Sequence, residues 1–166
     1  MSDEEKVASL PQGLTLQKTT FRHISELVDS TKWGDNLSGK EVEALSKYLQ
    51  LCAANKGTTI VREGSREAYL CLVVEGKVDV MKEGRQIGSV GPGHTFGEMS
   101  LIDGEPRSAS IVAEEKTTLI VLTRDGFTNL SLEVPALAIK VLFKISKLLS
   151  QRLRQTSGAL VEQLGD

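Results

Sequence analysis

The sequence predicts a mainly β domain, a sandwich or barrel of short strands, with helical segments before and after it in the chain. Three observations support this fold class. Nine of the 15 glycines fall between Gly57 and Gly104, and glycines at this density between short apolar runs indicate tight turns of a β structure. Apolar residues recur at helical spacing on both sides of this region. The length of 166 residues suits one compact domain.

The helical lead-in is expected to reach about residue 55. Ser38 and Glu41 fit a capping box, in which the serine hydroxyl and the glutamate side chain bond each other's backbone amides. The apolar positions that follow at helical spacing are Val42, Leu45, Leu49 and Cys52. We therefore expect one helix to continue to Cys52, and a shorter helix before it over residues 21–28. Residues 1–36 are expected to form a partly disordered lead-in, because residues 1–15 show no periodicity.

The β body is expected to contain regularly spaced short strands, as in a sandwich or barrel. The expected strands are Thr58–Arg62, Ala68–Val74, Lys77–Lys82, Gln86–Val90, Ala109–Ala113 and Thr117–Thr123. The run from Tyr69 to Val74 is apolar on both faces, so we expect it to be covered on both. Val78, Asp79 and Val80 alternate in polarity, as in a half-buried strand.

A long helix is expected to begin near Pro135, a residue suited to the first turn of a helix, and to end near residue 156. Its apolar stripe comprises Leu137, Ala138, Val141, Leu142, Ile145, Leu148, Leu149 and Leu153. A helix of ~20 residues is about 30 Å long. The stripe is therefore expected to pack against the body or against a second copy of the chain.

Composition excludes several classes of protein. The 20 basic and 22 acidic residues are nearly balanced, so no global charge attracts nucleic acid or anionic membrane. Two cysteines and two histidines are too few for a disulfide framework, a structural zinc site or the metal centre of a cupin-type enzyme. The acidic N-terminus does not resemble a signal peptide, and no apolar run approaches the ~20 residues that span a bilayer. We expect a cytoplasmic protein without a membrane segment or metal site.

Residues 96–111 carry the chemical information. Gly97 follows a strand and permits close approach of the backbone to a ligand. A short helical turn, about residues 98–102, then exposes its first amides, which favour an anion. Arg107 offers a guanidinium that can bond two anionic oxygens at once, and Glu98 can accept hydrogen bonds from hydroxyls. Amides and an arginine for a phosphate, with a carboxylate for a sugar hydroxyl, together describe a site for the phosphate and ribose of a nucleotide.

This segment resembles the phosphate-binding cassette of cyclic nucleotide-binding domains, which occur in the catabolite activator family, in cAMP-dependent kinase regulatory subunits and in nucleotide-gated channels. The matching residues are Phe96-Gly97-Glu98-Met99-Ser100-Leu101 and, after a spacer, Pro106-Arg107-Ser108-Ala109. Residues 57–64 and 74–78 resemble the first strand and the next hairpin of the same family. The resemblance implies a β-roll, a jelly-roll β-barrel of about eight strands. It places the nucleotide-binding domain with its lid helix at residues 37–157 and a tail at 158–166.

The resemblance also implies roles for individual residues. Glu98 would bind the ribose 2′-hydroxyl and Arg107 the exocyclic phosphate oxygens, with Gly97 near the ribose. The remaining phosphate donors would be the backbone amides of Met99, Ser100 and Ser108. A serine after the arginine is similar to cAMP binders, so cAMP is expected ahead of cGMP. Residues of the long helix in range to cap the base are Leu148, Leu149 and Arg152.

These implications predict a non-enzymatic regulatory module whose ligand is cAMP or cGMP, with no further cofactor. Ligand binding is expected to favour a closed position of the C-terminal helix and so to signal to an effector protein. The C-terminal helix also suits homodimerisation. No DNA-binding domain is expected, because the chain stops about ten residues beyond the expected end of that helix. The alternative is a structural or protein-interaction module of the same fold that senses no nucleotide.

Overall fold

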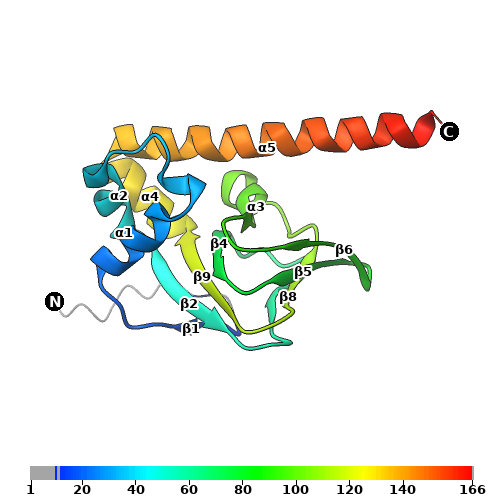
Figure 1. Cartoon of the computed structure of the whole chain (residues 1–166), viewed down its shortest axis with the longest axis horizontal. Helices are drawn as coiled ribbons and strands as arrows, with labels where there is room; N and C mark the ends of the chain where they lie inside the picture. Colours follow the sequence, from blue (N-terminus) through cyan, green and yellow to red (C-terminus); the bar gives the residue numbers. More distant parts are fainter. Residues whose placement is uncertain (1–9, 11, 166) are drawn as a thin grey trace. The chain divides into compact units, whose positions relative to one another are not determined.

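The structure, a computed structural model, describes residue 10 and residues 12–165. The chain divides into two compact units, Met1–Asn129 and Leu130–Asp166. The first unit contains the β body and the lead-in helices, and the second contains the long C-terminal helix (Figure 1). Of the lead-in that was expected to be partly disordered, residues 1–9 and 11 lie outside the described residues.

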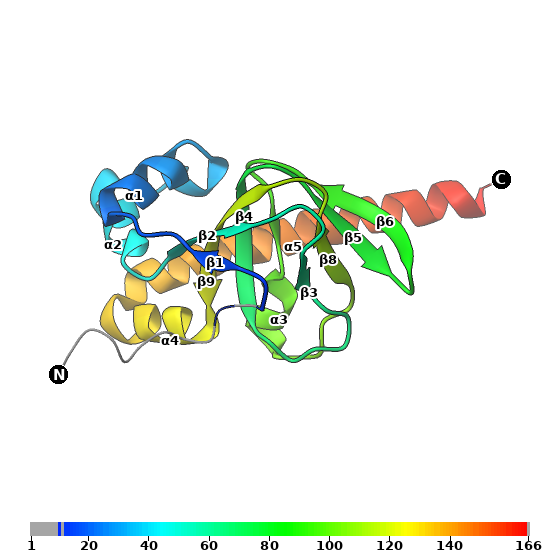
Figure 2. The ribbon, with the colours of Figure 1, turned by 90° about the horizontal axis from the view of Figure 1, so that it is seen from below.

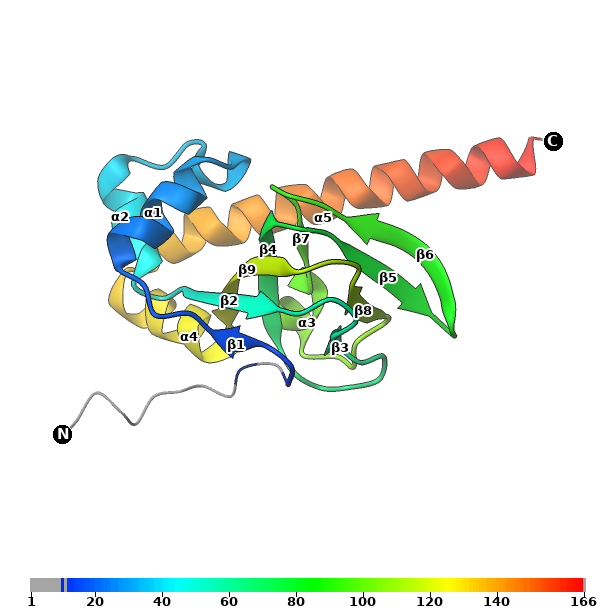
Figure 3. The ribbon, with the colours of Figure 1, turned by 60° about the horizontal axis from the view of Figure 1, so that its bottom comes forward.

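Two antiparallel sheets form the β body, which confirms the mainly β fold with flanking helices. The strands are β1 (Thr15–Leu16), β2 (Gln50–Ala54), β3 (Thr59–Val61), β4 (Tyr69–Glu75), β5 (Val78–Lys82), β6 (Arg85–Val90), β7 (Thr95–Phe96), β8 (Ser110–Ala113) and β9 (Thr117–Thr123). One sheet has the order β1-β2-β9-β4-β7, and the other has the order β3-β8-β5-β6. In Figure 3, β1 and β2 run side by side at the edge of the first sheet. In Figure 2, β6 forms an outer edge of the second sheet.

All six strands expected from the sequence are present, with ends that shift by at most one residue. Three further strands were not expected: β1, β2 and β7. Two of these have only two residues each, which is too short for a pattern to appear in the sequence. The lead-in is therefore built into the first sheet through β1, whose residues Thr15 and Leu16 pair with Ala53 and Cys52.

The interior strand β4, between β9 and β7, is buried on both faces, as expected from its sequence. Tyr69, Cys71 and Val73 belong to the main core cluster of the β body, together with apolar residues of β2, β3, β5, β7, β8 and β9. Leu72 points to the opposite side, where Ile24, Val28 and Val42 of the lead-in helices form a second cluster. Burial of apolar side chains on both faces fixes the register of β4, because a shift by one residue would exchange the two sets.

The lead-in contains α1 (Phe21–Asp29), a 3-10 turn η1 (Lys32–Gly34) and α2 (Gly39–Ser46). The capping box of α2 is confirmed: Glu41 N donates to Ser38 Oγ at 3.2 Å, and Ser38 N donates to Glu41 Oε1 at 3.0 Å. The expected continuation of this helix to Cys52 is wrong. The chain turns at residues 47–49, and Cys52 lies in β2 opposite Leu119 of β9. Periodicity alone does not separate a short buried strand from a helix, and here pairing with β9 decides.

Three helices follow from the cassette onward. The short helix α3 (Glu98–Asp103) is present where it was expected, whereas α4 (Arg124–Glu133) was not expected. The long helix α5 (Pro135–Leu164) begins at the expected proline but extends past residue 156, so the segment 158–164, expected to be a tail, is helical. No helix within residues 12–165 combines the length and the apolar character needed to cross a membrane.

Candidate functional site

The cassette begins with Gly97, whose backbone lies in the left-handed region at φ 84° and caps the N-terminus of α3. A Cβ atom at this position would lie 2.5 Å from the carbonyl oxygen of Tyr69 and 2.7 Å from Nη1 of Arg107. Only glycine therefore combines this conformation with this close approach. The turn directs Glu98 and Ser100 of α3 into the protein, where their exposed fractions are 2% and 5%.

Arg107 is the buried cation of the site, with an exposed fraction of 5%. Its Nη1 donates to the carbonyl oxygen of Gly97 and its Nη2 to that of Tyr69, both at 2.9 Å. Its Cζ lies 4.4 Å from the centroid of the Tyr69 ring, within the range of a cation–π contact. The backbone is held as well, because Arg107 N donates to Ser65 O and Gly64 N donates to Arg107 O. Position and orientation of the guanidinium are thus fixed from several sides.

The charge of Arg107 is balanced by dipoles and a π face rather than by an ion pair. Within the described part of the chain, no acidic side chain lies at ion-pair distance from its guanidinium, and its Nε has no hydrogen-bond partner. Burial lowers the pKa of Arg107, with smaller opposing contributions from Tyr69, Cys71 and Glu67, whose carboxylate is not at ion-pair distance. A buried cation without a counter-ion is costly, so this group is suited to receive an anion.

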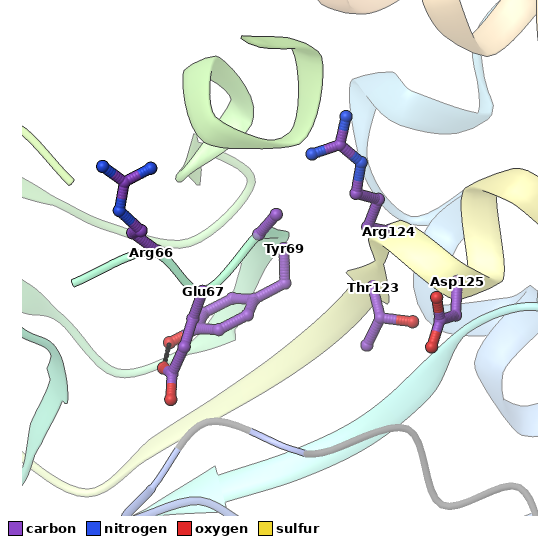
Figure 4. Close-up of a pocket in the computed structure, with 7 residues that line it drawn as sticks. Arg66, Glu67, Tyr69, Thr123, Arg124 and Asp125 are labelled. Carbon is purple, nitrogen blue, oxygen red and sulfur yellow. Dashed lines mark hydrogen bonds between the residues drawn. The ribbon is translucent and has the colours of Figure 1, made fainter. Parts of the chain in front are cut away.

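Tyr69 supports the guanidinium and is itself firmly held. Its hydroxyl is 3.1 Å from the carbonyl oxygen of Ile60, to which it donates, and 3.1 Å from a carboxylate oxygen of Glu67. Figure 4 shows the contact with Glu67 among the side chains that line a pocket. The volume of this pocket is about 500 Å³. The pocket is lined by Arg66, Glu67, Ala68, Tyr69, Thr123, Arg124 and Asp125. None of its lining residues belongs to the cassette, but the pocket adjoins the site through Tyr69, which contacts Arg107.

The structure places the six predicted ligand-binding residues in one region of the first unit. Gly97 and Arg107 are in direct contact, and the side chains of Glu98 and Ser100 are buried. The side chain of Met99 is 55% exposed, and that of Ser108 is also exposed. The predicted base-capping residues Leu148, Leu149 and Arg152 are half-buried on α5, in the second unit. Burial lowers the pKa of Arg152. Ligand contacts of all these residues stay predictions.

Two residues at the site were not predicted from the sequence. Tyr69 supplies both a ring and a carbonyl oxygen to Arg107, and Lys82 donates from Nζ to the carbonyl oxygen of Ser108 at 2.8 Å. A buried tyrosine in an otherwise aliphatic strand is a weak signal for Tyr69, since its hydroxyl needs a partner. Lys82 gives no signal in the sequence, because a lysine next to a hairpin turn is common on protein surfaces.

Comparison with known proteins identifies the family. Residues 52–133 match the family model described as "Cyclic nucleotide-binding domain". The solved structure of a cyclic nucleotide-binding domain from Methylobacillus flagellatus is 36% identical, with a TM-score of 0.79 over 91% of this chain and 89% of that one. The chain belongs to the cyclic nucleotide-binding domain family. This result confirms the resemblance inferred from the cassette and the β-roll fold.

Longer proteins also contain regions similar to this cyclic nucleotide-binding domain. A cyclic AMP receptor protein of Thermus thermophilus is 36% identical over 124 residues, which cover 72% of this chain and 56% of that protein. A cAMP-dependent protein kinase regulatory subunit of Yarrowia lipolytica is 32% identical over 98 residues, which cover 59% of this chain and 26% of that protein. The chain thus spans about half, and about a quarter, of the length of these two relatives.

Proposed function

We propose that this cyclic nucleotide-binding domain is a non-enzymatic regulatory module that binds cAMP in preference to cGMP. One observation carries the proposal: Arg107 is buried next to Gly97 and α3 without an acidic partner at ion-pair distance in the described residues. A cyclic phosphodiester carries a single negative charge and two exocyclic oxygens, which match one guanidinium. Related chains with cAMP in their names, such as the Thermus thermophilus receptor, support cAMP as the ligand.

The remaining cassette residues complete the proposed site. Glu98 accepts a hydrogen bond from the ribose 2′-hydroxyl, and the backbone amides of Met99, Ser100 and Ser108 donate to the phosphate. Leu148, Leu149 and Arg152 are the proposed base-capping residues. The domain limits 37–157 are proposed together with this site. Cyclic-GMP-dependent protein kinases, for example that of Plasmodium berghei at 32% identity, also match the chain, so the test compares both nucleotides.

The proposed output is a population shift. A ligand that binds better when α5 lies over the base increases the population of that arrangement and presents a changed surface to a partner. The partner is proposed to be an effector protein or a second copy of the chain, with which α5 would form a homodimer. We propose that this signalling takes place in the cytoplasm. A chain of the same fold that senses no nucleotide is the competing function.

Thermal unfolding of the wild-type chain with cAMP, cGMP, cyclic di-GMP and linear AMP tests the proposal. A ligand at ~100 times its Kd adds about 2.7 kcal/mol to the free energy of unfolding, which raises the Tm of a domain of this size by roughly 5–11 °C. We expect this rise with cAMP, a smaller rise with cGMP and none with linear AMP. No rise with either cyclic mononucleotide would overturn the proposal and favour the non-sensing module.

Variants then test the phosphate site itself. Arg107→Ala is expected to reduce the affinity for cAMP by roughly 30-fold to several thousand-fold, because the phosphate loses its buried cation. Arg107→Lys keeps the charge and serves as the second variant if Arg107→Ala does not fold. Arg62→Gln is the matched control, because Arg62 is exposed and directly precedes the loop whose Gly64 and Ser65 bond the backbone of Arg107. Wild-type affinity in a folded Arg107→Ala variant would refute the assignment of the phosphate site.

A further inference from the structure

Lys82 contacts the cassette from a hairpin on the neighbouring sheet. It is the last residue of β5, opposite Arg85 of β6. The two residues between them, Glu83 and Gly84, have φ angles of 50° and 77°, as expected for a two-residue hairpin turn with both central residues in the left-handed region. This tight turn ends β5 at Lys82, and the lysine Nζ donates to the carbonyl oxygen of Ser108 at 2.8 Å.

Glu63 holds both Lys82 and the hairpin turn. Its Oε1 lies 3.7 Å from Lys82 Nζ, and its Oε2 accepts a hydrogen bond from Glu83 N at 3.2 Å. The backbone amide of Glu63 donates to Ser110 Oγ at 2.9 Å. After Glu63, Gly64 N donates to Arg107 O, and Ser65 O accepts from Arg107 N. One short loop therefore connects the lysine, the hairpin and the segment between α3 and β8 that carries Arg107.

We propose that Lys82 is a positioning residue and the second cation of the phosphate site. This inference rests on the proposed function. Ser108 supplies the backbone amide that is proposed to donate to the phosphate, and the lysine ammonium bonds the carbonyl of the same residue. Lys82 therefore fixes the backbone of Ser108 directly after Arg107 and places a positive charge next to the bound anion.

The ammonium of Lys82 is partly exposed, which limits its effect on the affinity for the ligand. The side chains of Lys82 and Glu63 are 46% and 36% exposed, so water and salt screen the interaction with the ligand. Glu63 also offsets part of the lysine charge. Removal of Lys82 is therefore expected to weaken binding about five- to tenfold, the range between an exposed ion pair and a charge-assisted hydrogen bond.

The test measures Kd for cAMP by titration calorimetry at low and at high salt. Lys82→Met removes the charge and retains most of the aliphatic stem, whereas Lys82→Arg retains a cationic donor. Arg85→Met is the matched control, because Arg85 is a cation at the same end of the hairpin and is exposed. We expect a five- to tenfold loss in Lys82→Met, wild-type affinity within about twofold in the other two variants, and a weaker salt dependence of Kd in Lys82→Met.

Two further readouts separate this role from general stability and from the proposed function. The Tm of unliganded Lys82→Met is expected to stay close to that of the wild type, because surface substitutions change stability little. Wild-type affinity in Lys82→Met, or an equal loss in Lys82→Arg, would overturn the role of Lys82 alone, provided that the wild type binds cAMP and Arg107→Ala binds it at least roughly 30-fold more weakly. If the wild-type chain binds no cyclic nucleotide, both the proposed function and the role of Lys82 are wrong.

Discussion

The guanidinium of Arg107 lies over the ring of Tyr69, with Cζ 4.4 Å from the ring centroid, and its Nη2 donates to the carbonyl oxygen of the same tyrosine. The two residues are 38 positions apart in the chain. A π face and a carbonyl oxygen stabilise the cation without neutralising it, unlike a carboxylate. Tyr69 therefore keeps Arg107 ordered and leaves its positive charge available for an anion.

Two substitutions of Tyr69 distinguish the contribution of its hydroxyl from that of its ring. Tyr69→Phe loses the hydrogen bonds of the hydroxyl with Ile60 and Glu67, so the free energy of unfolding should fall by about 1 kcal/mol, with little change in nucleotide affinity. Tyr69→Leu also loses the ring, so the free energy of unfolding should fall by about 2 kcal/mol. The affinity for cAMP should fall about tenfold. Denaturant unfolding and calorimetry measure the two quantities. Equal affinities in the Phe and Leu variants would show that the ring does not position Arg107.

Gly97→Ala tests the close approach at the start of the cassette. The added Cβ meets the Tyr69 carbonyl and the Arg107 guanidinium, so the variant suffers both backbone strain and a collision. Gly57→Ala is the matched control, because Gly57 has φ 82° and no atom within 4 Å of a Cβ built there. We expect the control to lose about 1 kcal/mol of stability and to bind cAMP normally. Gly97→Ala should lose about 2 kcal/mol more and bind at least tenfold more weakly, as measured by unfolding and titration. Similar losses in both variants would rule out the collision.

Much of the fold could be predicted from the sequence because its signals are local. Glycine turns and alternating residues located six strands, and the Ser38–Glu41 capping box located the start of α2. The end of that helix could not be predicted. Leu49 and Cys52 continue a helical spacing, but Cys52 pairs with Leu119, 67 positions later in the chain, and the sheet outweighs the local pattern.

The candidate site was predictable only where its residues form a continuous motif. Gly97, Glu98 and Arg107 stand in one short segment, so the family pattern could be recognised there. Tyr69 and Lys82 reach the same segment from other strands, at separations of 38 and 26 residues. No pattern within one window of the sequence indicates such contacts. The contacts of both residues with the cassette follow from the tertiary structure, which places β4 and β5 beside it.

Alkaline pH is expected to destabilise the domain through its two buried thiols, Cys52 and Cys71. Burial raises the pKa of Cys52 from its ordinary value of 9.0 to about 11, and also raises the pKa of Cys71. Above pH ~9 the unfolded chain releases thiol protons that the native chain retains. The thiols therefore do not change the free energy of unfolding below pH ~9. As the pH rises from there through 11, each thiol lowers it by about 1.4 kcal/mol per pH unit.

Denaturant unfolding between pH 8 and 11 measures this slope. In Cys52→Ala/Cys71→Ala, the contribution of the thiols to the slope should be absent, whereas the ionisation of Tyr69, whose pKa burial also raises, remains. A slope equal to that of the wild type would show that the thiols do not cause the loss.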